Sequence, residues 1–178
     1  PASAPVIKET KKNSKKKTQA NQEAFDFLEP SGTYHPPSLT LLDHDGEAAN
    51  PVDKEALMMN ARLLEKKLLD FNVEGDVSEV KPGPVVTMYE FAPAPGVKVN
   101  KIAGLSDDLS MALKALSIRI VAPIPGRGVV GIEIPNRDRE MVYLKEIFST
   151  DEFQKTGGKL PLALGKDIFG HTVVSDLA

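Results

Sequence analysis

The sequence has no cysteine among its 178 residues, which excludes disulfide bonds and metal sites built from thiolates. It also has no apolar run near the roughly 18 residues that a membrane-spanning helix needs, and no recognisable signal peptide. These absences fit a soluble chain in a reducing compartment. Because the chain begins at Pro1 and not at a methionine, we expect it to be a fragment or a processed piece of a longer protein.

Charge is distributed unevenly along the chain. Residues 1–22 carry six lysines and one glutamate, a net charge of +5, whereas 16 basic and 24 acidic residues give 23–178 a net charge of −8. A basic tail on an acidic body is typical of a solvated linker, and less often of an arm that binds nucleic acid or anionic lipid. The acidic body argues against a broad DNA-binding face, since such faces are basic. We therefore predict a disordered basic linker over residues 1–36.

The clearest periodicity lies in the middle of the chain. Residues 85–91 are mostly β-branched and aromatic, which predicts a strand. Apolar residues at three- and four-residue spacing predict an amphipathic helix over 100–116. Residues 117–122 alternate, and a Pro- and Gly-containing turn at 123–128 leads into a further strand over 129–134. The order strand, helix, strand, strand implies a crossover helix on one face of a sheet, followed by a hairpin.

The preceding segment has the same order of elements. Asn50 as N-cap and Pro51 at the first helical position begin a predicted helix over 51–71, which carries one apolar stripe. A strand over 73–81 follows, and a Pro-Gly turn leads back into the strand at 85–91. Two α-β-β halves suggest an internal repeat. The predicted fold class is therefore α+β, a two-layer sandwich with a mostly antiparallel sheet and helices on one face.

Three further elements are predicted with less regular patterns. The leucines within 39–42 predict one short docking strand. Asn136 is expected to cap a third helix over 138–149. A hairpin within 160–176 has apolar residues and nothing after it to pack on, which predicts that it belongs to a larger domain.

No catalytic, cofactor-binding or metal site is predicted. Two Gly-Lys pairs, at 158–159 and 165–166, suggest a phosphate loop, but such a loop needs Ser or Thr after the lysine and a further glycine upstream. Leu160 and Asp167 follow the two lysines instead. The glycines beside Arg127 are those that a hairpin turn requires. No Ser, His and acidic residues have the spacing of a nucleophile–base arrangement.

Several stretches, read together, resemble the FtsK/SpoIIIE family of DNA translocases, specifically the α subdomain of the motor. They are GPVVTMYEFAPAPGVKVNKIAGLSDDLSMAL (83–113), IRIVAPIPGRGVVGIEIPN (118–136) and LPLALGKDIFGHTVVSDLA (160–178). Residues 53–77 and the PSLTLL at 37–42 also match. The resemblance implies three parts: a linker over 1–36, the α subdomain over 37–155, and the leading hairpin of a truncated RecA-like ATPase subdomain over 156–178.

The resemblance also implies a function and a set of partners. Members of this family are anchored in the bacterial inner membrane, and their cytoplasmic motors form homo-hexameric rings that pump double-stranded DNA during chromosome segregation at cell division. In them a RecA-like ATPase subdomain in cis binds ATP and Mg. Its phosphate loop would lie beyond Ala178, so the fragment itself is expected to hold no cofactor and to be no enzyme. Its expected role is ring assembly and force transmission.

Three arginines are the candidates for contacts with DNA or with neighbouring subunits: Arg119, Arg127 and Arg137. For any single one, an ordinary solvated arginine is the commoner outcome.

Two alternatives come from other functional classes. A small-molecule enzyme would need convergent polar groups that the sequence does not offer. A free-standing nucleic-acid-binding module would use the lysine tail. In that case, binding to duplex DNA weakens steeply with salt and is lost when residues 1–22 are removed. Steep salt dependence that survives this truncation would assign the binding to the folded domain instead.

Overall fold

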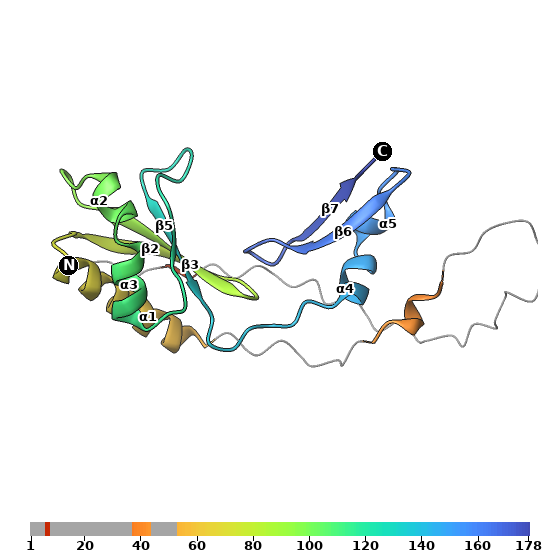
Figure 1. Cartoon of the computed structure of the whole chain (residues 1–178), viewed down its shortest axis with the longest axis horizontal. Helices are drawn as coiled ribbons and strands as arrows, with labels where there is room; N and C mark the ends of the chain where they lie inside the picture. The colour runs from red at the N-terminus through yellow and green to blue at the C-terminus, as the bar shows by residue number, and fades with distance from the viewer. Residues whose placement is uncertain (1–5, 8–36, 44–52) are drawn as a thin grey trace, which may run out of the picture. The chain divides into compact units, whose positions relative to one another are not determined.

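The computed structural model describes residues 6–7, 37–43 and 53–178, and the chain divides into two compact units (Figure 1). In the described part, the first unit contains the five strands of the larger sheet, three helices and the loop 166–171. The second contains the remaining helices and the strands of the C-terminal hairpin. None of the helices described here is both long and apolar enough to cross a membrane.

The first unit is built on a sheet with the strand order β1-β2-β3-β5-β4. β1 pairs with β2 in parallel, and the other three pairings are antiparallel. Because β5 lies between β3 and β4, the chain crosses over β5 before the hairpin that joins β4 to β5. The strands are β1 (Val6–Ile7), β2 (Gly75–Pro82), β3 (Val86–Pro93), β4 (Arg119–Val121) and β5 (Val130–Pro135).

Three helices supply the second layer: α1 (Lys54–Asp70), α2 (Val99–Ala103) and α3 (Ser106–Leu113). The predicted α+β class and the two-layer, mostly antiparallel architecture are thus confirmed. Both predicted α-β-β halves are present, as α1-β2-β3 and as α2 and α3 followed by β4-β5.

The first helix begins later than predicted. Asp53 is its N-cap, and one carboxylate oxygen accepts hydrogen bonds from the backbone N–H groups of Glu55 and Ala56, both at 3.1 Å. This satisfies two of the donors that a helix start leaves unpaired. The predicted cap, Asn50-Pro51, lies outside the described residues.

The helix predicted over 100–116 is two helices. The first ends at Gly104, and the second ends where Lys114 adopts a left-handed conformation with φ of 54°. The N–H of Ala115 then bonds the carbonyl of Ser110 at 2.9 Å, a typical C-terminal closure. Leu116, the last residue of the predicted helix, is consequently 87% exposed.

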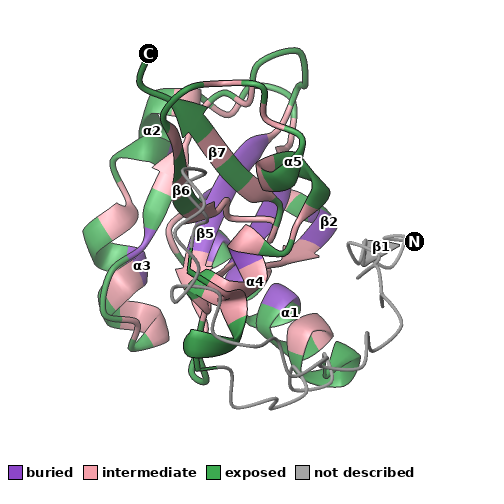
Figure 2. Ribbon diagram, turned by 90° about the vertical axis from the view of Figure 1, so that its right-hand side faces the viewer, coloured by how far each residue is buried: buried purple, intermediate pink, exposed green. Residues whose placement is uncertain are grey.

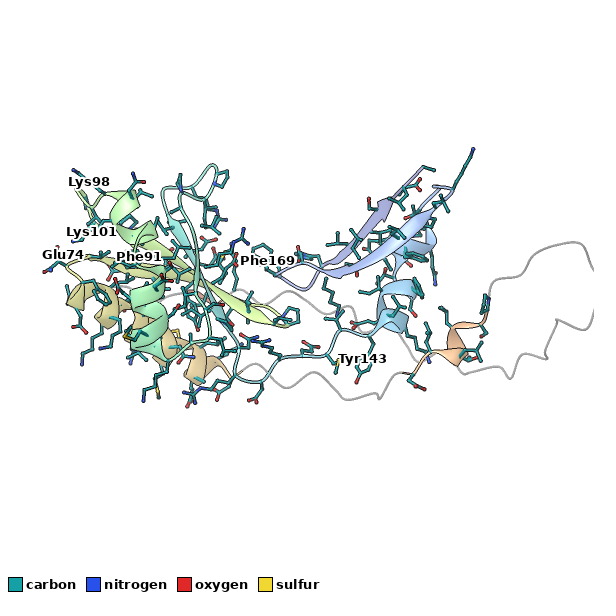
Figure 3. The ribbon with its side chains drawn as sticks, in the orientation of Figure 1. Glu74, Phe91, Lys98, Lys101, Tyr143 and Phe169 are labelled. Atoms are coloured by element: carbon teal, nitrogen blue, oxygen red, sulfur yellow. The ribbon has the colours of Figure 1, made fainter. Side chains whose placement is uncertain are left out.

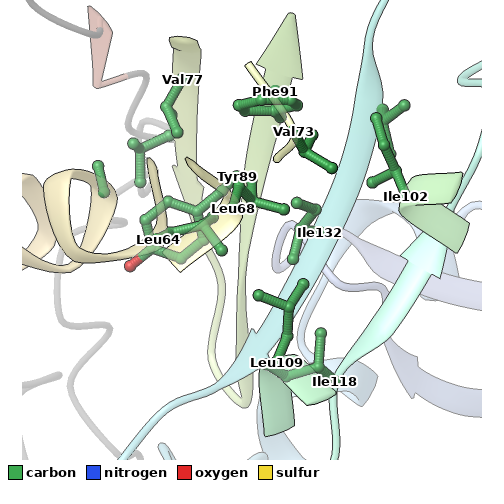
Figure 4. Packing of buried hydrophobic residues seen from close by; sticks show 13 residues of the cluster. Leu64, Leu68, Val73, Val77, Tyr89, Phe91, Ile102, Leu109, Ile118 and Ile132 are labelled. Carbon is green, nitrogen blue, oxygen red and sulfur yellow. The ribbon is translucent and has the colours of Figure 1, made fainter. Parts of the chain in front are cut away.

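The hydrophobic core lies between the helices and one face of the sheet (Figure 4). Leu64 and Leu68 of α1, Tyr89 and Phe91 of β3 and Ile132 of β5 are all essentially inaccessible to solvent. Figure 2 shows that buried residues are concentrated on the strands of this sheet. Close packing of this kind gives a unit that resists deformation.

Tyr89 gives a measurable signature of this core. Burial raises the pKa of Tyr89 from 10.0 to about 12, and a hydrogen bond with Asn60 offsets only part of that rise. Because the pKa of Tyr89 is higher in the folded chain than in the unfolded chain, the neutral phenol contributes to stability. This contribution is complete below about pH 10 and is lost as pH rises through 12. A phenolate absorbance titration should show one late-titrating tyrosine that the Tyr89→Phe variant lacks. Titration of all tyrosines together near pH 10 would contradict this burial.

A β-bulge in β2 explains why the alternation in its sequence is loose. The pairing with β3 shifts between Val77 and Glu79, so Ser78 is an extra residue. As a result, Val77 and Val80 both face the core, whereas Glu79 and Lys81 lie on the opposite face of the sheet.

In the second unit, the leucines near residue 40 form a turn of 3-10 helix, η2 (Leu39–Leu41), and the strand predicted there is wrong. The Ser38 hydroxyl accepts a hydrogen bond from the N–H of Thr40 at 3.3 Å, and this local bond favours a helical turn. The Nζ of Lys145 donates to the carbonyl of Leu42 at 3.0 Å.

The helix predicted over 138–149 is also wrong in its extent. The chain forms only α4 (Leu144–Phe148) and α5 (Asp151–Gln154), and Asn136 does not cap either. Its side chain accepts a hydrogen bond from the Thr87 hydroxyl at 2.7 Å and donates one to the carbonyl of Gly83 at 2.8 Å. Asn136 therefore fastens the end of β5 to the β2–β3 turn.

The predicted C-terminal hairpin is confirmed as a separate two-stranded sheet of β6 (Pro161–Lys166) and β7 (Thr172–Asp176). Asp176 closes its open end, where one carboxylate oxygen accepts a hydrogen bond from the N–H of Leu160 at 3.0 Å.

Candidate functional site

The face of the large sheet opposite the helices carries six charged side chains, which we call the charged face: Glu79, Lys81, Glu90, Arg119, Arg127 and Glu133. The strand register brings five of them together. One cross-strand row contains Lys81, Met88, Glu133 and Arg119, and the adjacent row contains Glu79, Glu90, Gly131 and Val121. Arg127 joins them from the loop between β4 and β5.

The three carboxylates of the charged face are buried. Glu90 is 3% exposed, and Glu79 and Glu133 are each 7% exposed. A carboxylate that loses this much hydration is tolerated only when it is paired and hydrogen-bonded. The three cations provide that pairing, so the charges of the face balance.

Arg127 binds two of these carboxylates at once. Its Nη1 donates to Glu79 Oε2 at 3.0 Å and to Glu90 Oε2 at 2.6 Å. These hydrogen bonds, with that to Glu79 contributing most, raise the pKa of Arg127. The loop that carries it turns at Gly126, whose φ of 75° lies in the left-handed region, and the N–H of Arg127 bonds the carbonyl of Ile124 at 3.1 Å.

Lys81 approaches the same carboxylates from β2. Its Nζ bonds Glu90 Oε1 and lies 3.7 Å from Glu79 Oε2. The ammonium group is also 5.5 Å from the centroid of the Phe169 ring, a cation–π distance. Phe169 belongs to the loop between β6 and β7 (Figure 3).

The other two predicted arginines differ in their surroundings. Arg119 is paired in register with Glu133, and its Nη1 lies 3.6 Å from Glu133 Oε2, but 75% of its side chain is exposed. An ion pair this open contributes little stability. Arg137 is exposed and follows the end of β5, so the register does not bring it to the charged face. The structure thus brings together two of the three predicted residues.

Sequence reasoning missed Lys81 and the three glutamates. A signal was present, because Glu79 and Lys81 alternate with valines in β2, and Glu90 interrupts the apolar β3. Alternating charges in a strand indicate a second face. Which charges meet across strands depends on the register, and the bulge at Ser78 shifts it.

The ionisable groups of the charged face form ion pairs with one another, which is typical of a structural or binding surface. Within the described ranges, no group of three or more His, Asp or Glu side chains is arranged to hold a metal ion. A shallow depression on α1 is lined by methionines and charged residues, and Met59 there is 70% exposed. The full lining is Lys54, Glu55, Met58, Met59 and Arg62.

Loop 166–171 is organised by the carboxylate of Asp167. One oxygen accepts hydrogen bonds from the N–H groups of Phe169 at 2.9 Å and His171 at 2.8 Å, and the other lies 3.1 Å from His171 Nδ1. Partial burial opposes ionisation of the carboxyl, but these bonds outweigh it and lower the pKa of Asp167 below 3.8.

The depressed pKa of Asp167 predicts acid sensitivity of this loop. The ionised carboxylate stabilises the fold above the unfolded pKa of 3.8, and the contribution is lost as pH falls through the lower folded value. In an NMR pH titration, we expect the amide signals of Phe169 and His171 to shift together below pH 3.8. Asp167→Asn should abolish that transition, and an unchanged transition in this variant would assign it to another group.

The comparisons with known proteins cover most of the chain. Residues 36–136 match the FtsK alpha domain family. The chain is 50% identical over 161 residues to a protein named DNA translocase FtsK from Azospirillum brasilense. The matched residues make up 89% of this chain and 25% of that protein. Proteins of the same name from Caulobacter vibrioides (43% identity, 94% of this chain, 20% of that protein) and Brucella suis (47%, 90% and 19%) are also similar. The chain spans a quarter or less of each of these relatives.

Proposed function

The chain belongs to the FtsK alpha domain family, and from this premise we propose that it is the non-catalytic subdomain of a ring-forming, ATP-driven translocase of double-stranded DNA. The longer protein would segregate chromosomes at cell division, anchored in the bacterial inner membrane with its motor on the cytoplasmic side. The observation that supports this most is the similarity to proteins named DNA translocase FtsK over nearly the whole chain.

The mechanical role proposed for the sheet unit is ring assembly and force transmission. A close-packed core on one face and paired charges on the other support this proposal, because both resist shear between strands. Glu79, Glu90 and Arg127 tie together β2, β3 and the β4–β5 loop. A unit joined in this way would pass on a displacement without deforming.

We propose that residues 37–155 form the α subdomain, preceded by a linker over 1–36 in which Val6–Ile7 pair with β2, and that 156–178 begin a RecA-like subdomain in cis. Exposed leucines on β6 support the second assignment: Leu162 is 40% and Leu164 62% exposed. Alternate residues of a strand share a face, and an apolar face of a sheet normally packs on another layer. That subdomain would bind ATP and Mg, and this chain would supply no catalytic residue.

The predicted arginines receive different roles in this proposal. Arg127 would stabilise the β4–β5 loop, since both of its carboxylate partners lie within this chain. Arg119, whose side chain is 75% exposed, and Arg137, which is also exposed, remain the proposed contacts with DNA or with a neighbouring subunit of the hexamer. An arginine that contacts a DNA phosphate should reduce the salt slope of DNA binding by about one when it is replaced.

The force-transmission proposal is tested in the longer protein with Arg127→Met, and with Arg62→Met as the matched control, since Arg62 is an exposed arginine of α1 outside the charged face. We expect the Arg127 variant to hydrolyse ATP in the presence of DNA but to displace less DNA per ATP. Unchanged displacement per ATP would contradict the proposal.

The isolated chain should release no phosphate from ATP and should stay smaller than a hexamer in light scattering.

A further inference from the structure

Loop 166–171 approaches the β2–β3 turn so closely that only glycine fits there. A Cβ atom on Gly83 would lie 1.8 Å from the carbonyl oxygen of Ile168, far inside any permitted contact. A Cβ on Gly170 would lie 3.8 Å from the Cδ of Pro84, an ordinary van der Waals distance. Backbone therefore packs on backbone at this point.

Beside this contact, one lysine connects the loop to the charged face. The Lys81 ammonium lies over the Phe169 ring and bonds Glu90 as well. Glu90 in turn accepts the hydrogen bond from Arg127. The side chains from Phe169 to Arg127 thus form one connected series of contacts.

The loop is also held together by hydrogen bonds of its own. The carboxylate of Asp167 holds two backbone N–H groups of the loop, and the Asp167 N–H donates to the carbonyl of His171 at 2.8 Å. A loop organised by its own hydrogen bonds presents the Phe169 ring at little entropic cost on docking.

We propose that loop 166–171 is an internal docking element whose seating controls the β4–β5 loop. Phe169 positions Lys81, Lys81 positions the carboxylate of Glu90, and that carboxylate holds Arg127. Release of the loop would leave the Lys81 ammonium mobile and loosen the β4–β5 loop. The proposal stands apart from the translocase proposal, because every contact in it lies within this chain.

A double-variant cycle with Phe169→Leu and Arg127→Met tests the link. Leucine keeps apolar bulk but removes the aromatic face that attracts the ammonium. Residues in one network show non-additive effects on stability. We expect the combined change in the unfolding constant to differ from the product of the two single changes by about 2-fold or more. Agreement with that product would overturn the proposal.

Amide hydrogen exchange supplies a second readout that does not depend on global stability. Phe169→Leu should speed exchange at the amides of Ile124 and Arg127, which are hydrogen-bonded within the β4–β5 loop. Phe148→Leu is the matched control, since Phe148 packs against Phe153 in the other unit at a centroid distance of 4.7 Å. Equal exchange at those amides in both variants would count against the proposal.

Two variants of Lys81 test the middle of this series of contacts by the same amide exchange measurement. Lys81→Met should reproduce the faster exchange of the Phe169 variant, because it removes the central cation of the series. Lys81→Arg keeps a cation that can lie over the ring and bond the carboxylate, and it should restore most of the protection. Protection that is independent of the residue at this position would contradict the proposed series of contacts.

Discussion

Replacing Phe91 by alanine is expected to lower the free energy of unfolding by about 3–5 kcal/mol. Phe91 is 0% exposed in a central strand, and its ring covers Gly75 so closely that a Cβ there would lie 2.5 Å from it. Surrounding side chains are held by the sheet and the helices, so they can fill the resulting cavity only in part. Urea unfolding followed by circular dichroism measures the change.

The control for Phe91 is another large-to-small change outside the core. Leu116→Ala removes an apolar side chain that is 87% exposed, so its effect should stay within about 0.5 kcal/mol. If both variants lost similar stability, the assignment of the core would be wrong.

Replacing Glu90 by alanine should have the second-largest effect, a loss of roughly 2–3 kcal/mol. Glu90 is 3% exposed, and its carboxylate bonds both Lys81 and Arg127. Its removal leaves Glu79 with two cations, and hydrogen bonds to charged groups contribute more than neutral ones. The same urea unfolding experiment applies.

Two further variants test the reason for the Glu90 effect. Glu90→Gln keeps the shape and one acceptor oxygen, so its loss should be smaller than that of alanine. Glu74→Ala removes an exposed carboxylate just before the same sheet and should change stability little. A loss at Glu74 equal to that at Glu90 would show that the charged face has no special role in stability.

The core side of this fold could be predicted from the sequence. Helix α1 carries one apolar stripe, and strand β3 is rich in β-branched and aromatic residues, so both patterns predict elements that pack on a core. The break between α2 and α3 could not be predicted, because apolar spacing continues through Gly104 and Leu105. The break is a local change of backbone direction, and the spacing of the apolar residues does not indicate it.

The wrong helix over 138–149 shows a different limit. Asn136 is a good N-cap by type, but Thr87 and Gly83 compete for its side chain from a distant part of the sequence. Tertiary hydrogen bonds of this kind override a local preference. The charged face was missed for the same reason, since Arg127 meets Glu79 and Glu90 only through the strand register.

The central claim is that this chain is the sheet-bearing subdomain of a DNA-translocating ATPase. The most direct test is the coding sequence immediately downstream of Ala178. The proposal predicts a Gly-x-x-x-x-Gly-Lys-Ser/Thr phosphate loop within the next few tens of residues, at about the distance that a strand and turn require. A stop codon there would contradict it and leave a free-standing domain without a motor.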